Sequence, residues 1–305
     1  QPQGMSRRPA SHAGSWYTDR KDQLAAQLQS WLQEVDECCG AARAIIAPHA
    51  GYSYSGPTAA WAYKSIQPSQ VQRIFVLGPS HNVYTPRCAV TRCSTYETPL
   101  GDIPIDRQIC ADLLATGLYD EMEQSVDEQE HSIEMHLPYI VHVMGGQPFT
   151  LVPILVGALS EEAEARYGQL LAPYLMQQGN LLIISSDFCH WGRRFRFQHY
   201  DRTRGQIFES IEALDQRGMA LIEAQDPGGF AAYQKQFGNT ICGQFPIAVL
   251  LHALEHCRRI RKHALRFVRY AQSSRCRSMS DSSVSYASAI VWCPETEEAY
   301  QNARE

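Results

Sequence analysis

Three short apolar runs, each followed by a loop that carries a histidine, constrain the possible folds of this chain most strongly. The runs and their histidines are 44–47 with His49, 73–77 with His81, and 181–184 with His190. Each run has the length and composition of a buried strand, and proline or glycine opens the loop after the first two. In open α/β sheets, ligands bind at the edge where strands pass into such loops. The pattern therefore predicts one shared site at a sheet edge.

Strands and helices alternate through the first two thirds of the chain, which is typical of an α/β protein. Strands are predicted at 43–47, 73–77, 87–93, 149–156, 180–185, 263–274 and 283–292, and helices at 20–36, 57–66, 106–116, 127–144, 161–178, 200–214, 230–237 and after 239–243. We expect one domain with a central mixed, mostly parallel sheet that helices cover on both faces. Residues 1–10 are expected to be a tag remnant and a flexible N-terminus, 11–293 the domain, and 294–305 a flexible tail.

The composition argues against several classes of protein. A formal net charge of −5 and a pI near 6.1 do not fit a general nucleic-acid binder. No apolar run reaches the roughly 18 residues that cross a bilayer, and no secretory signal is visible. The ten cysteines show no zinc-finger CxxC spacing and no disulfide framework. We therefore expect reduced thiols in a cytoplasmic protein, with a nuclear location also open.

The histidines after the first two runs, His49 and His81, are candidate metal ligands, because neutral imidazole suits iron, copper and zinc. The third ligand stays open among Asp187, His190 and Cys242. Asp187 would complete a triad of two histidines and one carboxylate, as in non-haem Fe(II) oxygenases. Cys242 precedes a predicted helix that Thr240 would cap, and a helix N-terminus favours thiolate. The alternative for Cys242 is a buried, small apolar side chain.

Other motifs give weaker indications. His131 and His136 flank Glu134 without the H-E-x-x-H spacing of zinc proteases, so either a packed polar network or a supporting role beside the metal is expected. Arg193, Arg194 and Arg196 fit either a solvated loop or an anion contact. The chain has no G-x-G-x-x-G, no Walker A motif and no G-x-S-x-G nucleophile elbow.

Seven longer motifs are spread along the chain. They are APHAGY at 47–52, LGPSH at 77–81, DEQEHSIEMHLP at 127–138, SSDFCHWG at 185–192, NTICG at 239–243, YAQSS at 270–274 and DSSVSY at 281–286. Together they resemble the Memo family. The resemblance extends from Ser11 to about Val291. It implies a fold similar to the catalytic subunit of class III extradiol dioxygenases, which are non-haem iron enzymes.

The resemblance also implies roles for single residues. His49, His81 and Cys242 match the positions that hold one transition-metal ion, iron or copper. Both His190 and Asp187 match residues that line the same pocket, and both are expected to be catalytic. His190 matches the acid/base histidine of the dioxygenases and would handle protons, and Asp187 would orient it or a bound water. Further pocket or ligand-binding positions are expected at Tyr54, Ser80, Trp16, His131 and Glu134.

Two functions follow from the resemblance. The first is a redox-active metal protein, a metal-dependent oxidoreductase if it is an enzyme. Ring cleavage is not favoured, because Cys242 replaces the dioxygenase carboxylate and a softer thiolate favours Cu(I) while still allowing iron. The second is a non-catalytic adaptor that binds a phosphotyrosine peptide in the same pocket. The family is linked to receptor tyrosine kinase signalling of the ErbB type, cell motility and the cytoskeleton.

Overall fold

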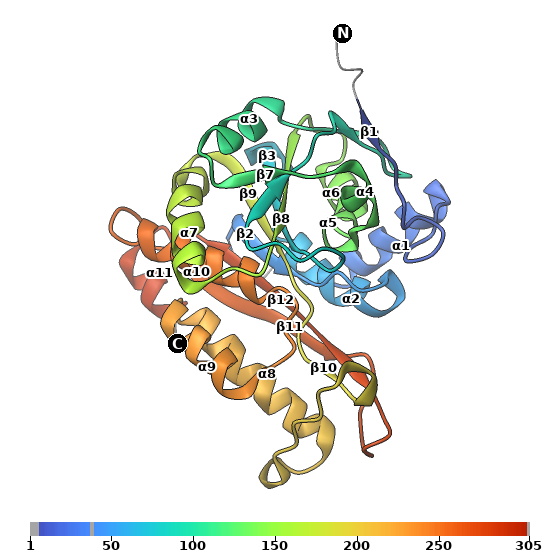
Figure 1. The fold of residues 1–305 in the computed structure, drawn as a ribbon, viewed down its shortest axis with the longest axis vertical. Coiled ribbons are helices and arrows are strands. Elements are labelled where there is room, and N and C mark those ends of the chain that lie inside the picture. The colour runs from blue at the N-terminus through green and yellow to red at the C-terminus, as the bar shows by residue number, and fades with distance from the viewer. Residues whose placement is uncertain (1–5, 37–39, 304–305) are drawn as a thin grey trace.

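The fold is built on a nine-stranded mixed sheet, seen near the centre of Figure 1. The computed structural model describes residues 6–36 and 40–303, so the predicted tag remnant lies outside the described residues. Strand order is β10-β12-β2-β9-β3-β8-β4-β7, with β11 paired to β12. These strands are β2 (Ala42–Ala47), β3 (Val71–Pro79), β4 (Cys88–Val90), β7 (Tyr119–Glu121), β8 (Thr150–Val156), β9 (Gly179–Ser185), β10 (His190–Trp191), β11 (Ala264–Gln272) and β12 (Ser283–Trp292).

Three parallel neighbours form the middle of this sheet. β9 pairs with β2 on one side and with β3 on the other, both in parallel register. Their apolar side chains, such as Ile45, Phe75 and Ile183, are fully buried because helices cover both faces. Parallel pairing brings the carboxyl ends of β2, β9 and β3 to one edge, which confirms the predicted α/β class and the shared strand ends.

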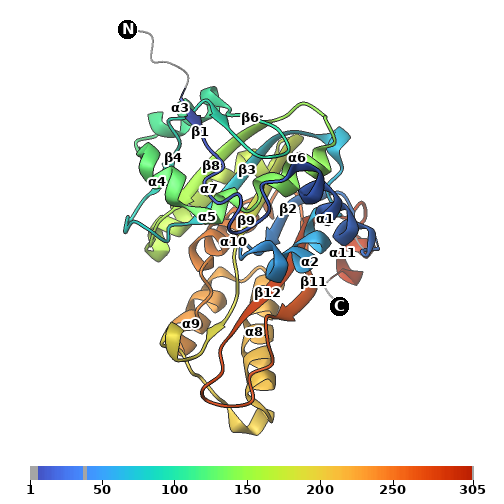
Figure 2. The ribbon, with the colours of Figure 1, turned by 90° about the vertical axis from the view of Figure 1, so that its right-hand side faces the viewer.

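Helices cover both faces of the sheet (Figure 1). α7 and α10 pack together and against the β3–β9 region, whereas α2 contacts β2 and β12, and α5 contacts β3. The helices are α1 (Lys21–Gln33), α2 (Tyr52–Tyr63), α3 (Arg107–Ala115), α4 (Gln124–Gln129), α5 (His131–Glu134), α6 (Leu137–Met144), α7 (Glu161–Met176), α8 (Ile207–Glu223), α9 (Pro227–Phe237), α10 (Gln244–Cys257) and α11 (Glu297–Asn302). Figure 2 shows α8, α9 and the β11–β12 hairpin extending together toward the bottom of the view, away from α3 and α6.

Three helix predictions were wrong in their bounds. The helix predicted at 127–144 is divided into α4, α5 and α6. The Glu130 side chain caps α5 by accepting from the Ser132 N–H, and α6 begins after His136 with a proline in its first turn. α2 begins at Tyr52, so Pro57 lies inside the helix instead of opening it. The helix predicted at 200–214 begins only at Ile207, where Gln206 and Glu209 form a capping box.

The chain segment before residue 11 takes part in a second, three-stranded sheet. β1 (Arg7–Arg8) pairs with β5 (Thr95–Tyr96), which pairs with β6 (Ile103–Pro104). The Arg8 side chain is only 1% exposed and forms ion pairs with Asp127 at 2.9 Å and Glu134 at 2.7 Å. This strand lies within the segment predicted to be flexible, just as α11 lies within the predicted tail.

Two further expectations concern membrane-spanning helices and disulfide bonds. Among the described residues, no helix combines the length and the apolar character that crossing a membrane would require. Every cysteine in the same part of the chain is free, and most are buried.

Candidate metal centre

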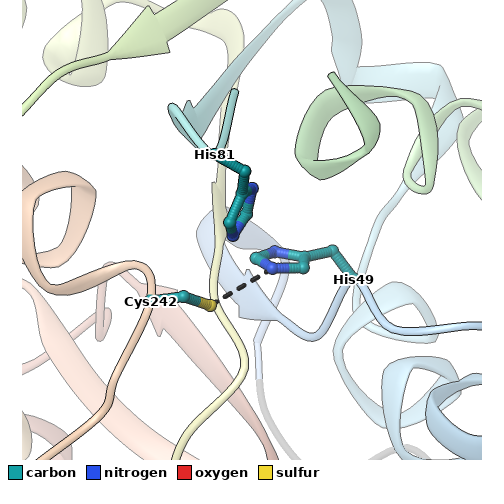
Figure 3. Close-up of side chains that lie close together, drawn as sticks. All are labelled: His49, His81 and Cys242. Atoms are coloured by element: carbon teal, nitrogen blue, oxygen red, sulfur yellow. Dashed lines mark hydrogen bonds between the residues drawn. The ribbon is translucent and has the colours of Figure 1, made fainter. Parts of the chain in front are cut away.

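Three side chains from distant parts of the sequence converge at the carboxyl edge of the sheet. His49 follows β2, His81 follows β3, and Cys242 precedes α10. Figure 3 shows the three side chains pointing toward one another. One ligand atom from each lies within 4.8 Å of the other two. Asp187 and His190 do not meet this criterion, so Cys242 has the best geometry of the three candidates for a third ligand.

The hydrogen bonds of His49 fix its protonation. Its Nδ1 lies 2.7 Å from Ser185 Oγ, and that hydroxyl donates its single proton to the Ser132 carbonyl at 2.7 Å. Ser185 must therefore accept from His49 Nδ1–H, which leaves the Nε2 lone pair facing the centre. Burial, followed by the proximity of His81, lowers the pKa of His49 well below its usual value. The ring is therefore neutral, which is the form that binds a metal.

A buried carboxylate orients His81 in the same way. Glu130 accepts hydrogen bonds from His81 Nδ1 at 2.8 Å and from the His81 backbone N–H at 2.7 Å. Burial raises the pKa of Glu130, but these bonds and one from Ser132 outweigh it and set the pKa to about 2. The ionised carboxylate holds the His81 proton on Nδ1 and leaves Nε2 for a metal, as in carboxylate–histidine–metal triads. Gly78 permits this approach, since a Cβ there would clash with Ser132 and Ile133.

Cys242 contributes a sulfur at the partly exposed side of the centre. Its Sγ lies 3.2 Å from His49 Nε2 and accepts the Asp187 backbone N–H at 3.2 Å. Since Nε2 carries no proton, the Cys242 thiol is the donor in this contact, and the Asp187 carbonyl at 3.5 Å is the other acceptor within its reach. The predicted cap by Thr240 is absent, because α10 begins at Gln244 with Gly243 as its N-cap. Burial, followed by the charge of Asp187, raises the pKa of Cys242, so the predicted thiolate does not form without a metal.

Asp187 and His190 lie beside these three residues. Asp187 Oδ1 accepts the His49 backbone N–H at 2.9 Å, and Oδ2 lies 3.9 Å from His49 Nε2. Burial raises the pKa of Asp187, while the proximity of His190 opposes this shift. His190 Nδ1 lies 2.8 Å from the Phe188 carbonyl and 3.0 Å from the Thr240 carbonyl. Because carbonyls only accept, Nδ1 carries the proton and Nε2 is free to accept one.

An aromatic stack adjoins the histidines. The His131 ring lies between His81 and Trp16, with ring centroids 4.3 Å from each. Burial, followed by the proximity of His81, lowers the pKa of His131 to about 4. His81, Glu130 and His131 form a second group with metal-ligand spacing. This second group shares His81 with the first group. The hydrogen bond between Glu130 and His81 Nδ1 explains why its ligand atoms lie close together.

The remaining predicted pocket residues differ in exposure. Tyr54 lies on α2 and is 64% exposed, whereas the Ser80 hydroxyl donates to the Val83 carbonyl at 2.5 Å. Glu134 is completely buried, and its carboxylate forms hydrogen bonds with Arg8, His12 and Tyr17. The structure therefore brings His131 and Trp16 together with the centre, but places Glu134 in a buried ion-pair network.

The residues present fit a metal ion. A tetrahedral ion with metal–ligand bonds of roughly 2.0–2.3 Å separates its ligand atoms by about 3.5 Å. The distance of 3.2 Å from His49 Nε2 to Cys242 Sγ is close to this value, and all three ligand atoms lie within 4.8 Å of one another. Each imidazole has its other nitrogen held by Ser185 or Glu130. A bound metal ion would replace the thiol proton of Cys242, so metal binding would release a proton.

Sequence reasoning missed the residues that orient the ligands. Ser185 and Glu130 were within recognised motifs, but only their distance to the histidines reveals their role. Ser185 could have been suggested by its place at the end of the strand before Asp187. No sequence signal identified Arg8, which anchors the segment carrying Glu130 through a bond to the Glu130 carbonyl at 3.0 Å.

Comparisons with known proteins match nearly the whole chain. A family model described as "Memo-like protein" matches residues 8–290. Protein MEMO1 of Danio rerio is 53% identical over 290 residues, covering 93% of this chain and 97% of the relative. Protein MEMO1 of Homo sapiens is 52% identical over 287 residues, with the same coverages. Protein memo-1 homolog of Caenorhabditis elegans is 49% identical over 292 residues, covering 95% of this chain and 83% of its own length.

Among solved structures, an uncharacterised protein, JW3007, from Escherichia coli K12 aligns with a TM-score of 0.47 and 13% identity. The alignment covers 80% of this chain and 98% of that chain.

Proposed function

Because the chain belongs to the Memo family, we propose that it is a metal-binding protein in which His49, His81 and Cys242 hold one iron or copper ion. The observation that carries this proposal is the convergence of three ligand atoms within 4.8 Å. Support also comes from Ser185 and Glu130, which direct both imidazole lone pairs toward that point. Two nitrogens and one thiolate favour Cu(I) and still accept iron.

We further propose that the centre is redox-active. When bound, iron or copper would supply one-electron chemistry. His190 would handle protons through Nε2, because the Phe188 and Thr240 carbonyls hold its Nδ1 proton. Asp187 would orient His49 through the backbone and keep negative charge beside the cation. The buried walls formed by His49 and Asp187 would exclude water from one side.

Metal analysis of protein purified without added metal tests this proposal. Wild type is expected to retain close to one equivalent of iron or copper. His49→Ala and Cys242→Ser are each expected to lose most of it, because each removes a ligand atom. Cys293→Ser is the matched control, since Cys293 is also partly exposed but is not among the proposed ligands. Unchanged iron and copper in both ligand variants would show that the site is assigned to the wrong residues.

A second candidate is a phosphotyrosine-binding adaptor that acts in receptor tyrosine kinase signalling, cell motility and the cytoskeleton, in the cytoplasm or also the nucleus. The observation in its favour is a group of three arginines within six residues after His190. Arg193, Arg194 and Arg196 are exposed, and none forms an ion pair with an acidic side chain among residues 6–36 and 40–303. Guanidinium groups of this kind bind phosphate through paired hydrogen bonds.

Calorimetry with a phosphotyrosine peptide and its unphosphorylated twin separates the two candidates. The adaptor function predicts heat only for the phosphorylated peptide, and weaker binding when Arg194 is changed to alanine. Arg166→Ala on α7 serves as the control because Arg166 is also exposed. Equal weak heats for both peptides would contradict the adaptor function and leave metal binding as the sole proposal.

A further inference from the structure

We propose that Asp215 is a positioning residue that holds together the two segments carrying His190 and Cys242. This inference rests on the proposed function, because it assumes that Cys242 binds the metal and that His190 handles protons. Asp215 lies on α8 and is completely buried. Sequence reasoning did not select it, because the helix predicted at 200–214 ended one residue before it, whereas α8 extends to Glu223.

The environment of Asp215 is unusual for a carboxylate. Among the described residues, no lysine, arginine or histidine forms an ion pair with it. Burial raises the pKa of Asp215 to about 6, although several hydrogen bonds oppose the shift. A carboxylate whose folded-state pKa is raised lowers stability at neutral pH. Global stability therefore does not explain why a carboxylate occupies this position.

The hydrogen bonds of Asp215 lead to both segments of the site. Its Oδ1 accepts the backbone N–H of Cys189 at 3.3 Å and the Nδ2 of Asn239 at 2.9 Å. Cys189 directly precedes His190, and Asn239 opens the segment that ends in Cys242 and Gly243. A single carboxylate oxygen thus bridges two segments that are far apart in sequence.

The two segments are joined again next to the site. The Thr240 hydroxyl accepts the His190 backbone N–H at 2.7 Å and donates to the His190 carbonyl at 3.0 Å. The Thr240 carbonyl also lies 3.0 Å from His190 Nδ1, so it helps to set the direction of that ring. A shift of Asn239 would therefore turn the His190 ring and move Cys242 away from Asp187, whose N–H bonds its sulfur.

The other carboxylate oxygen anchors Asp215 to the sheet. Oδ2 accepts the Tyr270 hydroxyl of β11 at 2.9 Å, and the same hydroxyl lies 3.1 Å from Ser285 Oγ of β12. The bridge is therefore attached to a rigid pair of strands, and this attachment gives Asp215 a fixed position relative to the sheet. An amide at position 215 keeps the size of the side chain but weakens the charge-assisted bonds at Oδ1.

The test compares Asp215→Asn with Glu212→Gln, an exposed change on the same helix, in the full chain. The first measurement is the rate of Cys242 alkylation by iodoacetamide in chelator-treated protein, with Cys293 as the internal reference. Loss of a charge-assisted bond is expected to raise the Cys242 rate roughly tenfold while the Cys293 rate stays the same. The second is Cu(I) affinity against a competing chelator, expected to fall by about tenfold or more. Glu212→Gln should change neither.

The outcomes separate the two proposals. An unchanged Cys242 rate in folded Asp215→Asn, or equal acceleration of Cys242 and Cys293, would overturn the positioning role. If Asp215→Asn does not fold, Asn239→Ala breaks the same link from the other side and must accelerate Cys242 alkylation. A wild-type protein that binds neither iron nor copper would refute the proposed function. The alkylation comparison is made without metal, so it would still decide the role of Asp215.

Discussion

Replacing Arg8 with methionine is expected to lower the free energy of unfolding by about 3–5 kcal/mol, because it leaves buried carboxylates without their cation. The Arg8 guanidinium pairs with Asp127 and Glu134, and both acids are at most 2% exposed. It also donates to the Pro9, Asp127 and Glu130 carbonyls. Urea denaturation at neutral pH, followed by circular dichroism, measures the change.

Arg7→Met is the matched control for this prediction. Arg7 stands on the same strand but is exposed, and its ion pairs with Glu97 and Asp102 are in contact with solvent. Such pairs contribute little to stability, so the denaturation midpoint of this variant should stay close to that of wild type. If both arginine variants unfolded at the wild-type midpoint, Arg8 would have no anchoring role.

Replacing Gly243 with alanine is expected to remove metal retention and to destabilise the fold. A Cβ at this position would lie closer than 3.0 Å to both Ser186 Cβ and the Ser185 carbonyl oxygen. The segment would have to move away from β9 and carry Cys242 with it. Overpacking of this kind costs about 1–3 kcal/mol, and displacement of a ligand should reduce metal affinity by at least roughly tenfold. Metal content and urea denaturation measure the two effects.

Gly228→Ala provides the comparison for this variant. A Cβ there meets only Asp226 Oδ1 at 3.8 Å, and the position is within the first turn of α9. Alanine should be neutral or slightly stabilising there. Retention of the metal by Gly243→Ala, with an unchanged midpoint, would mean that the Cys242 segment does not depend on close contact with β9.

Sequence reasoning placed the candidate residues at one sheet edge where chemistry and local structure coincide. Each of β2, β3 and β9 is an apolar run with a clear end, so the placement of His49, His81 and Asp187 at one edge followed from strand direction alone. The choice of Cys242 over Asp187 and His190 did not follow from spacing. It came from the family resemblance, and the distances from Cys242 to the two histidines now support it.

The parts that sequence reasoning missed depend on contacts between distant segments. Arg8 looked like an ordinary terminal arginine, yet it is buried against acids more than a hundred residues later. The break between α4 and α5 was missed because the Glu130 side chain accepts from Ser132 N and binds His81 instead of continuing a helix. Local propensity contains no information about such partners, since a side chain's role depends on what folds beside it.

The order of the strands has a consequence for biosynthesis. β12, near the end of the chain, inserts between β10 and β2, and Cys242 itself belongs to the last quarter of the sequence. While the ribosome is still elongating the chain, an emerging fragment can present His49 and His81 but has neither the sulfur nor the neighbouring strand that closes the sheet. Under the proposed function, a nascent chain would therefore gain its third ligand only after Cys242 has left the ribosome.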